Sequence, residues 1–202
     1  MIIINNAPQS LVFQSPKVRV LQQDDNIYVN PAWNLGVESA HHDLLLLSND
    51  DIDFSEGMLE WAHHVLTLPF VGIVGPAEKA LNSGRTGMLW FTPARVRTTG
   101  YGVWMAMRKA SYVHVPDDLL IWGGDDWLFY RQDWRLNLHL HGGRITTKMS
   151  ETVNSEERFM GLAAEDHRRY LENHSQIERN YRRYHPIYWL LNRTTKIHRP
   201  SG

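Results

Sequence analysis

Residues 44–74 read LLLLSNDDIDFSEGMLEWAHHVLTLPFVGIV. The four consecutive leucines at 44–47 form a run too short for a helix of its own. Such a run is typical of a central strand that is covered on both faces. The polar residues 48–53 follow directly, so the sequence predicts an acidic segment at the C-terminal end of a buried strand.

The rest of this stretch predicts a helix and then another strand. Ser55 is a candidate N-cap for a helix over 56–68, and Pro69 ends that helix before the apolar residues 71–74. Further strands are predicted at 2–4, 18–21, 102–107 and 144–149, further helices at 30–40, 125–139 and 163–184, and a loop at 84–99. Asn30 is the predicted N-cap of the helix that starts there, and the helix over 163–184 is predicted to carry Tyr170, Ile177 and Tyr181 on one apolar stripe. Alternating strands and helices predict an α/β fold with a mainly parallel sheet and helices on both faces.

Three carboxylates lie in the segment that follows the leucine strand. In parallel sheets ligands bind at the carboxyl ends of the strands, which is where Asp50, Asp51 and Asp53 are expected. Oxygen ligands suit Mg²⁺ or Mn²⁺, which commonly share them with a diphosphate. A solvated acidic turn would have the same composition, so both interpretations stay open.

A second acidic site is predicted in Trp122-Gly123-Gly124-Asp125-Asp126-Trp127. A carboxylate within hydrogen-bond reach of a hydroxyl can take its proton, and the flanking indoles offer apolar faces to sugar rings. The alternative is a polar turn in which Asp125 or Asp126 caps a helix.

Length and composition limit the classes of protein that the chain can belong to. The 202 residues suffice for one large domain, and no apolar run approaches the roughly 20 residues that span a bilayer. The absence of cysteine excludes disulfides and thiolate sites, and with no basic N-terminal region it favours a cytoplasmic protein.

Charge is unevenly distributed along the sequence. Residues 158–202 contain nine Lys+Arg and four Asp+Glu, which leaves the first 157 residues at −6. This tail could touch phosphate, a partner or an anionic membrane surface, although a solvated amphipathic helix would look the same. The acidic remainder argues against binding to nucleic acid.

Two sets of motifs resemble known glycosyltransferases. The first set is similar to family 2 glycosyltransferases of the GT-A fold, and comprises Asn26, Asn34, Gly36, Ala40, the leucine strand and residues 49–52 and 71–76. The second set, residues 100–103, 122–126 and 129–131, resembles the Trp-Gly-Gly-Glu-Asp segment of β-1,4-galactosyltransferases. The resemblance covers residues 1–155, so residues 156–202 are expected to form a basic, aromatic, helical extension.

The resemblance implies inverting transfer of a sugar from a UDP- or GDP-sugar to an acceptor hydroxyl, with Mn²⁺ or Mg²⁺. Asp51 matches the metal-binding Asp of the DxD motif, with Asn49 in the place of the first Asp, whereas the alternative register makes Asp53 the ligand. Asp126 matches the usual base, and Asp125 replaces a Glu that contacts the acceptor. The implied donor-binding residues are Asn5, Asn26, Asn34 and Asp50, and the implied acceptor-binding residues are Trp104, Trp122, Gly123, Gly124 and Trp127.

The sequence departs from these families in two places. The first strand and helix of the relatives have no counterpart, so the fold is expected to be truncated at the N-terminus. No histidine stands where relatives supply a third metal ligand, which leaves His139, His141, His167 or none. These departures keep two alternatives open: a non-catalytic module that binds a glycan or a protein, and a half-enzyme completed by another chain or another copy of itself.

Overall fold

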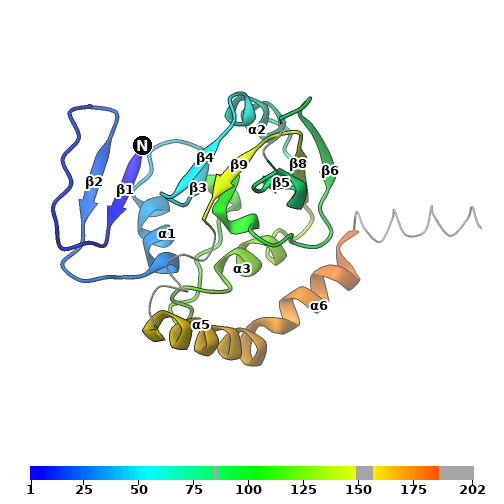
Figure 1. The fold of residues 1–202 in the computed structure, drawn as a ribbon. Coiled ribbons are helices and arrows are strands. Elements are labelled where there is room, and N and C mark those ends of the chain that lie inside the picture. Colours follow the sequence, from blue (N-terminus) through cyan, green and yellow to red (C-terminus); the bar gives the residue numbers. More distant parts are fainter. Residues whose placement is uncertain (84–85, 149–156, 187–202) are drawn as a thin grey trace, which may run out of the picture.

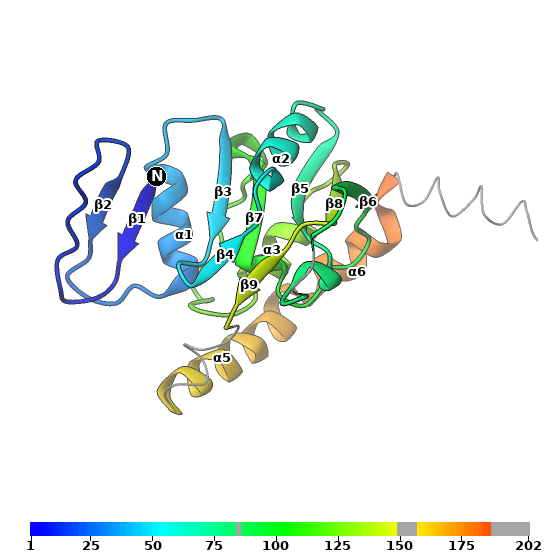
Figure 2. The ribbon, with the colours of Figure 1, turned by 45° about the horizontal axis from the view of Figure 1, so that its top comes forward.

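A mixed sheet of five strands organises the chain (Figure 1). The computed structural model describes residues 1–83, 86–148 and 157–186. In spatial order the sheet consists of β3 (Leu44–Ser48), β7 (Trp104–Arg108), β5 (Val71–Pro76), β8 (Leu136–His141) and β6 (Trp90–Pro93), as Figure 2 shows from one edge to the other. Only β5 and β8 pair in parallel, and the other neighbours are antiparallel.

The prediction of a mainly parallel sheet is therefore wrong. Parallel neighbours need a long crossover, usually a helix. The described residues that lead into β6 and β7 contain only the 3-10 helices η1 (Glu78–Ala80) and η2 (Tyr101–Val103), so both strands enter the sheet in the opposite direction.

Two pairs of strands lie outside the main sheet. β1 (Ile2–Asn5) pairs in parallel with β2 (Arg19–Gln22), and β4 (Ile52–Phe54) pairs antiparallel with β9 (Ile145–Thr147). Figures 1 and 2 both place the β1–β2 pair at one side of the molecule, next to α1. Within the described residues β1 and β3 each have only one strand partner, and the Ile and Leu side chains at 2–4 and 44–46 stay half-buried.

Helices cover both faces of the sheet. They are α1 (Val29–Glu38), α2 (Met58–Leu66), α3 (Gly124–Tyr130), α5 (Glu157–Arg169), the π-helical turn η4 (Tyr170–His174) and α6 (Ser175–Tyr184), with a further 3-10 turn η3 (Lys109–Ser111). The core has two clusters on opposite faces, because alternate residues of β7 enter different clusters: Met105 and Met107 one, Trp104 and Ala106 the other.

The first cluster joins the sheet to α1, α3 and the C-terminal helices. Tyr170 and Tyr181 pack there with Phe129, and Ile177 lies against the same cluster. The predicted apolar stripe of the C-terminal helix is thus confirmed. The described part of the predicted C-terminal extension packs as part of the core, along the lower side of α3 in Figure 1.

The leucine strand is covered on both faces, as predicted, but it is not central. Leu45 and Leu47 contact one cluster, and Leu44 and Leu46 the other. β3 nevertheless forms an edge of the five-stranded sheet, because only β7 pairs with it.

Both predicted helix caps, Asn30 and Ser55, are wrong, because their side chains bind residues far away in the sequence instead of the start of a helix. Asn30 lies inside α1, and its amide donates to the Leu119 and Trp122 carbonyls. Ser55 Oγ accepts the Arg144 N–H, while α2 begins after Gly57, whose φ is +83°.

Two further element predictions need correction. The helix predicted over 125–139 ends at Tyr130, since Asp133 adopts φ +41° and the chain turns into β8. The loop predicted over 84–99 contains β6, which pairs with β8. No helix of the described residues is both long enough and apolar enough to cross a membrane.

Candidate active site

The acidic pair, Asp125 and Asp126, lies in the first turn of α3. Gly123 precedes the helix in the left-handed region (φ +78°), a conformation that glycine adopts without strain. The backbone N–H of Asp126 donates to Asp125 Oδ1 at 3.0 Å, and the positive end of the helix dipole favours carboxylates here. Asp126 is buried, with 11% of its side chain exposed.

The turn that leads into α3 is held from both sides. Asn30 binds the carbonyls of Leu119 and Trp122, and a Cβ atom on Gly124 would collide with the Asn30 side chain. On the other side, Asp166 Oδ2 accepts three consecutive backbone N–H groups, those of Leu120, Ile121 and Trp122, at 2.9, 2.6 and 3.0 Å.

Arg97 binds both carboxylates of the acidic pair. Its Nε and Nη2 donate to the two oxygens of Asp126 at 2.6 and 2.9 Å, and its Nη1 lies 2.9 Å from Asp125 Oδ2. Burial alone would lower the pKa of Arg97, but the two carboxylates raise it well above its usual range. The pKa of Asp125 is raised, chiefly by burial and against the opposing effect of Arg97.

The turn Gly102–Val103 connects the acidic pair with the acidic segment 48–53. The Asn49 N–H donates to the Val103 carbonyl at 3.1 Å, at the end of β3. A Cβ atom on Gly102 would stand 3.0 Å from the Asp125 side chain. One short turn therefore contacts both the Asn49 backbone of the acidic segment and the Asp125 side chain of the acidic pair.

Within the acidic segment, Asp50 and Asp51 are exposed and bind no other described residue. Asp53 lies on β4, where it pairs with Arg144 at 3.3 Å and is exposed, between the half-buried Ile52 and Phe54. Among the described residues no three His, Asp or Glu side chains converge on a possible metal position. Within the described ranges the residues therefore do not fit a cation held by three protein ligands, and the exposed carboxylates fit only a cation that takes its other ligands from elsewhere.

Two of the implied donor-binding asparagines, Asn5 and Asn34, use their side-chain hydrogen bonds within the fold. Asn5 is buried and binds Gln9, Gln22 and the Ala7 N–H. The amide of Asn34 joins α1 to the segment 112–115, and its oxygen accepts the Tyr112 hydroxyl and the Val115 N–H. Asn26 accepts the Tyr28 N–H through its side-chain oxygen.

The three implied acceptor-binding tryptophans differ in exposure. Trp104 is fully buried between the sheet and α2, so its expected contact with an acceptor needs correction: its ring is a core group. Trp122 is half-buried against the rings of His167 and Tyr170. Trp127 is half-buried too, with its N–H bound to the His114 carbonyl and Arg131 over its ring.

The candidate histidine ligands have packing roles. His139 and His141 lie on β8, where burial lowers the pKa of both, and His141 stacks on Trp90. His167 contacts the Trp122 ring.

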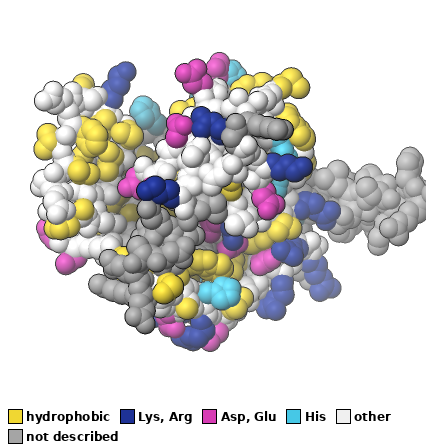
Figure 3. Space-filling model, in the orientation of Figure 1, with side chains coloured by type: hydrophobic (Ala, Val, Ile, Leu, Met, Phe, Trp, Pro, Cys, Tyr) yellow, Lys and Arg dark blue, Asp and Glu magenta, His cyan; other side chains and the backbone are white. Residues whose placement is uncertain are grey.

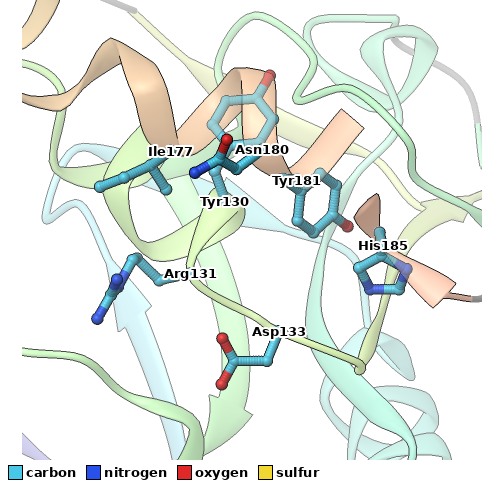
Figure 4. Close-up of a pocket in the computed structure, with 7 residues that line it drawn as sticks. All are labelled: Tyr130, Arg131, Asp133, Ile177, Asn180, Tyr181 and His185. Carbon is cyan, nitrogen blue, oxygen red and sulfur yellow. The ribbon is translucent and has the colours of Figure 1, made fainter. Parts of the chain in front are cut away.

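A small pocket of about 270 Å³ opens at the C-terminal end of α3, away from its first turn (Figure 4). It is lined by Tyr130, Arg131, Asp133, Ile177, Asn180, Tyr181 and His185. Neither the acidic pair nor the acidic segment reaches it, so this pocket is separate from the candidate active site.

The fold of the chain is similar to that of a solved glycosyltransferase structure. The described fold resembles the crystal structure of GalNAc-T7 with UDP, GalNAc and Mn²⁺, with a TM-score of 0.58 and 11% sequence identity. The match covers 90% of this chain and 44% of that chain, so this chain spans less than half of the length of its structural neighbour. A likeness at this identity supports a GT-A-like fold. No protein-family model matches the sequence, and no curated protein matches it.

Sequence reasoning identified the acidic pair but missed Asn30 and Asp166, which hold its turn. Asp166 lies 44 residues after Trp122 in a helix rich in charged residues, so nothing local distinguishes it. Arg97 lies in the segment predicted as a loop over 84–99, 29 residues before Asp126, so no local pattern indicates that it binds the acidic pair.

Proposed function

We propose that the protein transfers a sugar from a nucleotide-sugar donor to an acceptor hydroxyl, with inversion and with Asp126 as the base. The observation that carries the proposal is the contact of the turn Gly102–Val103 with both acidic sites. The turn meets the backbone of Asn49 on one strand end and the side chain of Asp125, and the fold is similar to that of a glycosyltransferase crystallised with UDP and Mn²⁺; both observations support the proposal.

The proposed reaction is a single displacement. The acceptor oxygen forms a bond to the anomeric carbon, its proton passes to a carboxylate oxygen of Asp126, and the bond from that carbon to the diphosphate oxygen breaks. The nucleoside diphosphate leaves with the electron pair. Asp126 suits this role because it is buried beside a turn that its own helix and Asp166 hold in place.

We assign the donor diphosphate to the acidic segment. Asp51 is the proposed carboxylate for a divalent cation, Mn²⁺ or Mg²⁺, which would offset the charge on the leaving diphosphate. Asp53 is the weaker candidate, because Arg144 already pairs with it. Asp50 and Asn26 remain candidates for contacts to the UDP or GDP moiety.

The acceptor is proposed to lie against the turn that starts α3. Trp122 and Trp127 are half-buried and flank the glycines 123 and 124 and the acidic pair. Apolar sugar-ring faces fit such partly exposed indoles. A glycan acceptor is therefore preferred over an acceptor without ring faces.

Calorimetric titration tests the donor site. Because no protein-only metal group exists among the described residues, Mn²⁺ alone is expected to bind weakly, and UDP or GDP to bind measurably only when Mn²⁺ is present. Asp51→Ala should abolish this coupled binding, while Asp24→Ala, an exposed control far from the acidic segment in sequence, should not. Tight Mn²⁺ binding without nucleotide would contradict the shared site.

Asp126→Asn tests the base. Transfer should fall by about 10²–10⁴-fold, the usual contribution of general-base catalysis, while donor affinity stays near the wild-type value. Equal loss of donor binding and transfer would argue that Asp126 serves the fold instead.

A second candidate function rests on the unpaired strand edges. Since β1 and β3 each have one edge without a partner in the described residues, another chain could add a strand and complete the site. In that case the isolated protein binds a glycan or a partner without metal and turns over no nucleotide sugar. Light scattering would then detect an oligomer or a complex. A transfer assay on that assembly would show activity that the isolated protein lacks.

A further inference from the structure

Arg97 uses every side-chain nitrogen at the acidic pair. Nε and Nη2 take one oxygen each of Asp126, and Nη1 lies between Asp125 Oδ2 and the Thr98 carbonyl, at 2.9 and 3.2 Å. This is the bidentate geometry in which an arginine fork meets a carboxylate most strongly. Each Asp126 oxygen keeps one lone pair that the fork does not use.

The loop that carries Arg97 is anchored at both ends. The Ala94 N–H donates to the Asn137 carbonyl at 2.7 Å, and the Thr98 hydroxyl donates to the Pro76 carbonyl at 3.0 Å. Ala94 is fully buried. The guanidinium is therefore delivered to the acidic pair by a fixed segment between β6 and η2.

Arg97 is also the charge that balances the pair. Among the residues that the structure describes, the other titratable groups around Asp126 are Tyr130 of α3 and Tyr170 of η4, and burial raises the pKa of both phenols, which keeps them neutral. Glu178 and Arg182 of α6 lie beyond Tyr130 and pair with each other. Two adjacent carboxylates in a buried turn would resist ionisation together without a cation at this position.

We propose that Arg97 is a positioning residue of the transfer reaction, which fixes the plane of the Asp126 carboxylate and directs its free lone pairs at the acceptor hydroxyl. This inference rests on the proposed function. Arg97 does not touch the reacting atoms. Its effect reaches the reaction through the geometry and the charge of Asp126.

The test compares Arg97→Gln and Arg97→Lys with the wild type in the transfer reaction, across a range of pH. The acid limb of kcat/KM reports the ionisation of the base in the free enzyme. Arg97→Gln removes the positive charge, so the acid limb should move to higher pH by about one to three units. Arg97→Lys keeps the charge but loses the fork, so the limb should stay near the wild-type position while kcat falls by about 10-fold or more.

Arg95→Gln is the matched control, because it removes a positive charge from the same loop two residues away. It should leave the acid limb where it is. Calorimetric binding of UDP with Mn²⁺ should be unchanged in the Arg97 variants, because the Arg97 side chain binds Asp125, Asp126 and the Thr98 carbonyl and makes no contact with Asp51.

Failure of the inference differs from failure of the proposed function. Wild-type transfer with an unshifted acid limb in Arg97→Gln, or with wild-type kcat in Arg97→Lys, would overturn the role of Arg97 alone. No transfer by the wild type with any nucleotide sugar would overturn both. If Arg97→Gln does not fold, the kcat of Arg97→Lys still decides.

Discussion

At the scale of single residues, glycines and buried polar groups shape the candidate site. Gly75 of β5 has no Cβ, and the Tyr101 ring fills that space. From there the Tyr101 hydroxyl donates to the Ile73 and Leu138 carbonyls at 3.2 and 3.0 Å. Tyr101 is the first residue of η2, whose residues Gly102 and Val103 contact both acidic sites. The packing of Tyr101 on Gly75 therefore positions the turn that joins the two sites.

Gly75→Ala tests this dependence. The added methyl group would overlap the Tyr101 ring, so we expect a loss of about 1–3 kcal/mol in the free energy of unfolding, measured by urea denaturation. Gly161→Ala is the control, since nothing lies within 4 Å of a Cβ atom there and α5 favours alanine over glycine. Equal stability of Gly75→Ala and the wild type would contradict the proposed role of this contact.

At the scale of elements, α5 supports the turn before α3. Asp166 is fully buried and holds three backbone N–H groups of residues 120–122, and Tyr170 of η4 lies against Gly123. Other charged side chains of α5 pair on its outer face, as Arg168 does with Glu165 and Glu172. Arg182 and Arg183 of α6 are exposed. Lys and Arg side chains gather at the lower right of Figure 3.

Asp166→Ala would leave the three N–H groups without an acceptor in a buried place. We expect a loss of about 1–3 kcal/mol in the free energy of unfolding, the cost of unsatisfied buried donors. Because these donors lie just before the acidic pair, transfer should also fall. Glu172→Ala, which removes an exposed carboxylate of the following turn, should change stability by less than about 1 kcal/mol. If Asp166→Ala is as stable as the wild type, the turn before α3 does not depend on Asp166.

At the scale of the whole molecule, partly or fully buried histidines in and near the sheet make stability depend on pH. Burial lowers the pKa of His139, His141 and His185 below the ordinary value of 6.5. The unfolded chain therefore binds more protons than the folded one in the range below pH 6.5, so stability is present above that pH and is lost as the pH falls.

His139→Gln should reduce this dependence. Between pH 7.5 and the folded-state pKa of His139, the unfolding free energy of the wild type should decrease more steeply with falling pH than that of the variant. Thermal unfolding followed at several pH values measures the difference. His63→Gln, on the exposed face of α2, is the control and should keep the wild-type slope. If the unfolding free energies of His139→Gln and the wild type change equally with pH, His139 does not contribute to the pH dependence of stability.

Local patterns of the sequence determined the strands at 2–4, 44–47 and 71–74, the helix after Ser55 and the two acidic sites, because periodicity and turn chemistry act between neighbours in the chain. The tertiary structure decided the mixed strand order, the burial of Trp104 and the use of Asn30 and Ser55 outside helix caps. It also decided that Arg97 and Asp166 serve the acidic pair, 29 and 44 residues away from their partners. Such contacts depend on which surfaces meet when the sheet and helices pack, and no local pattern encodes them.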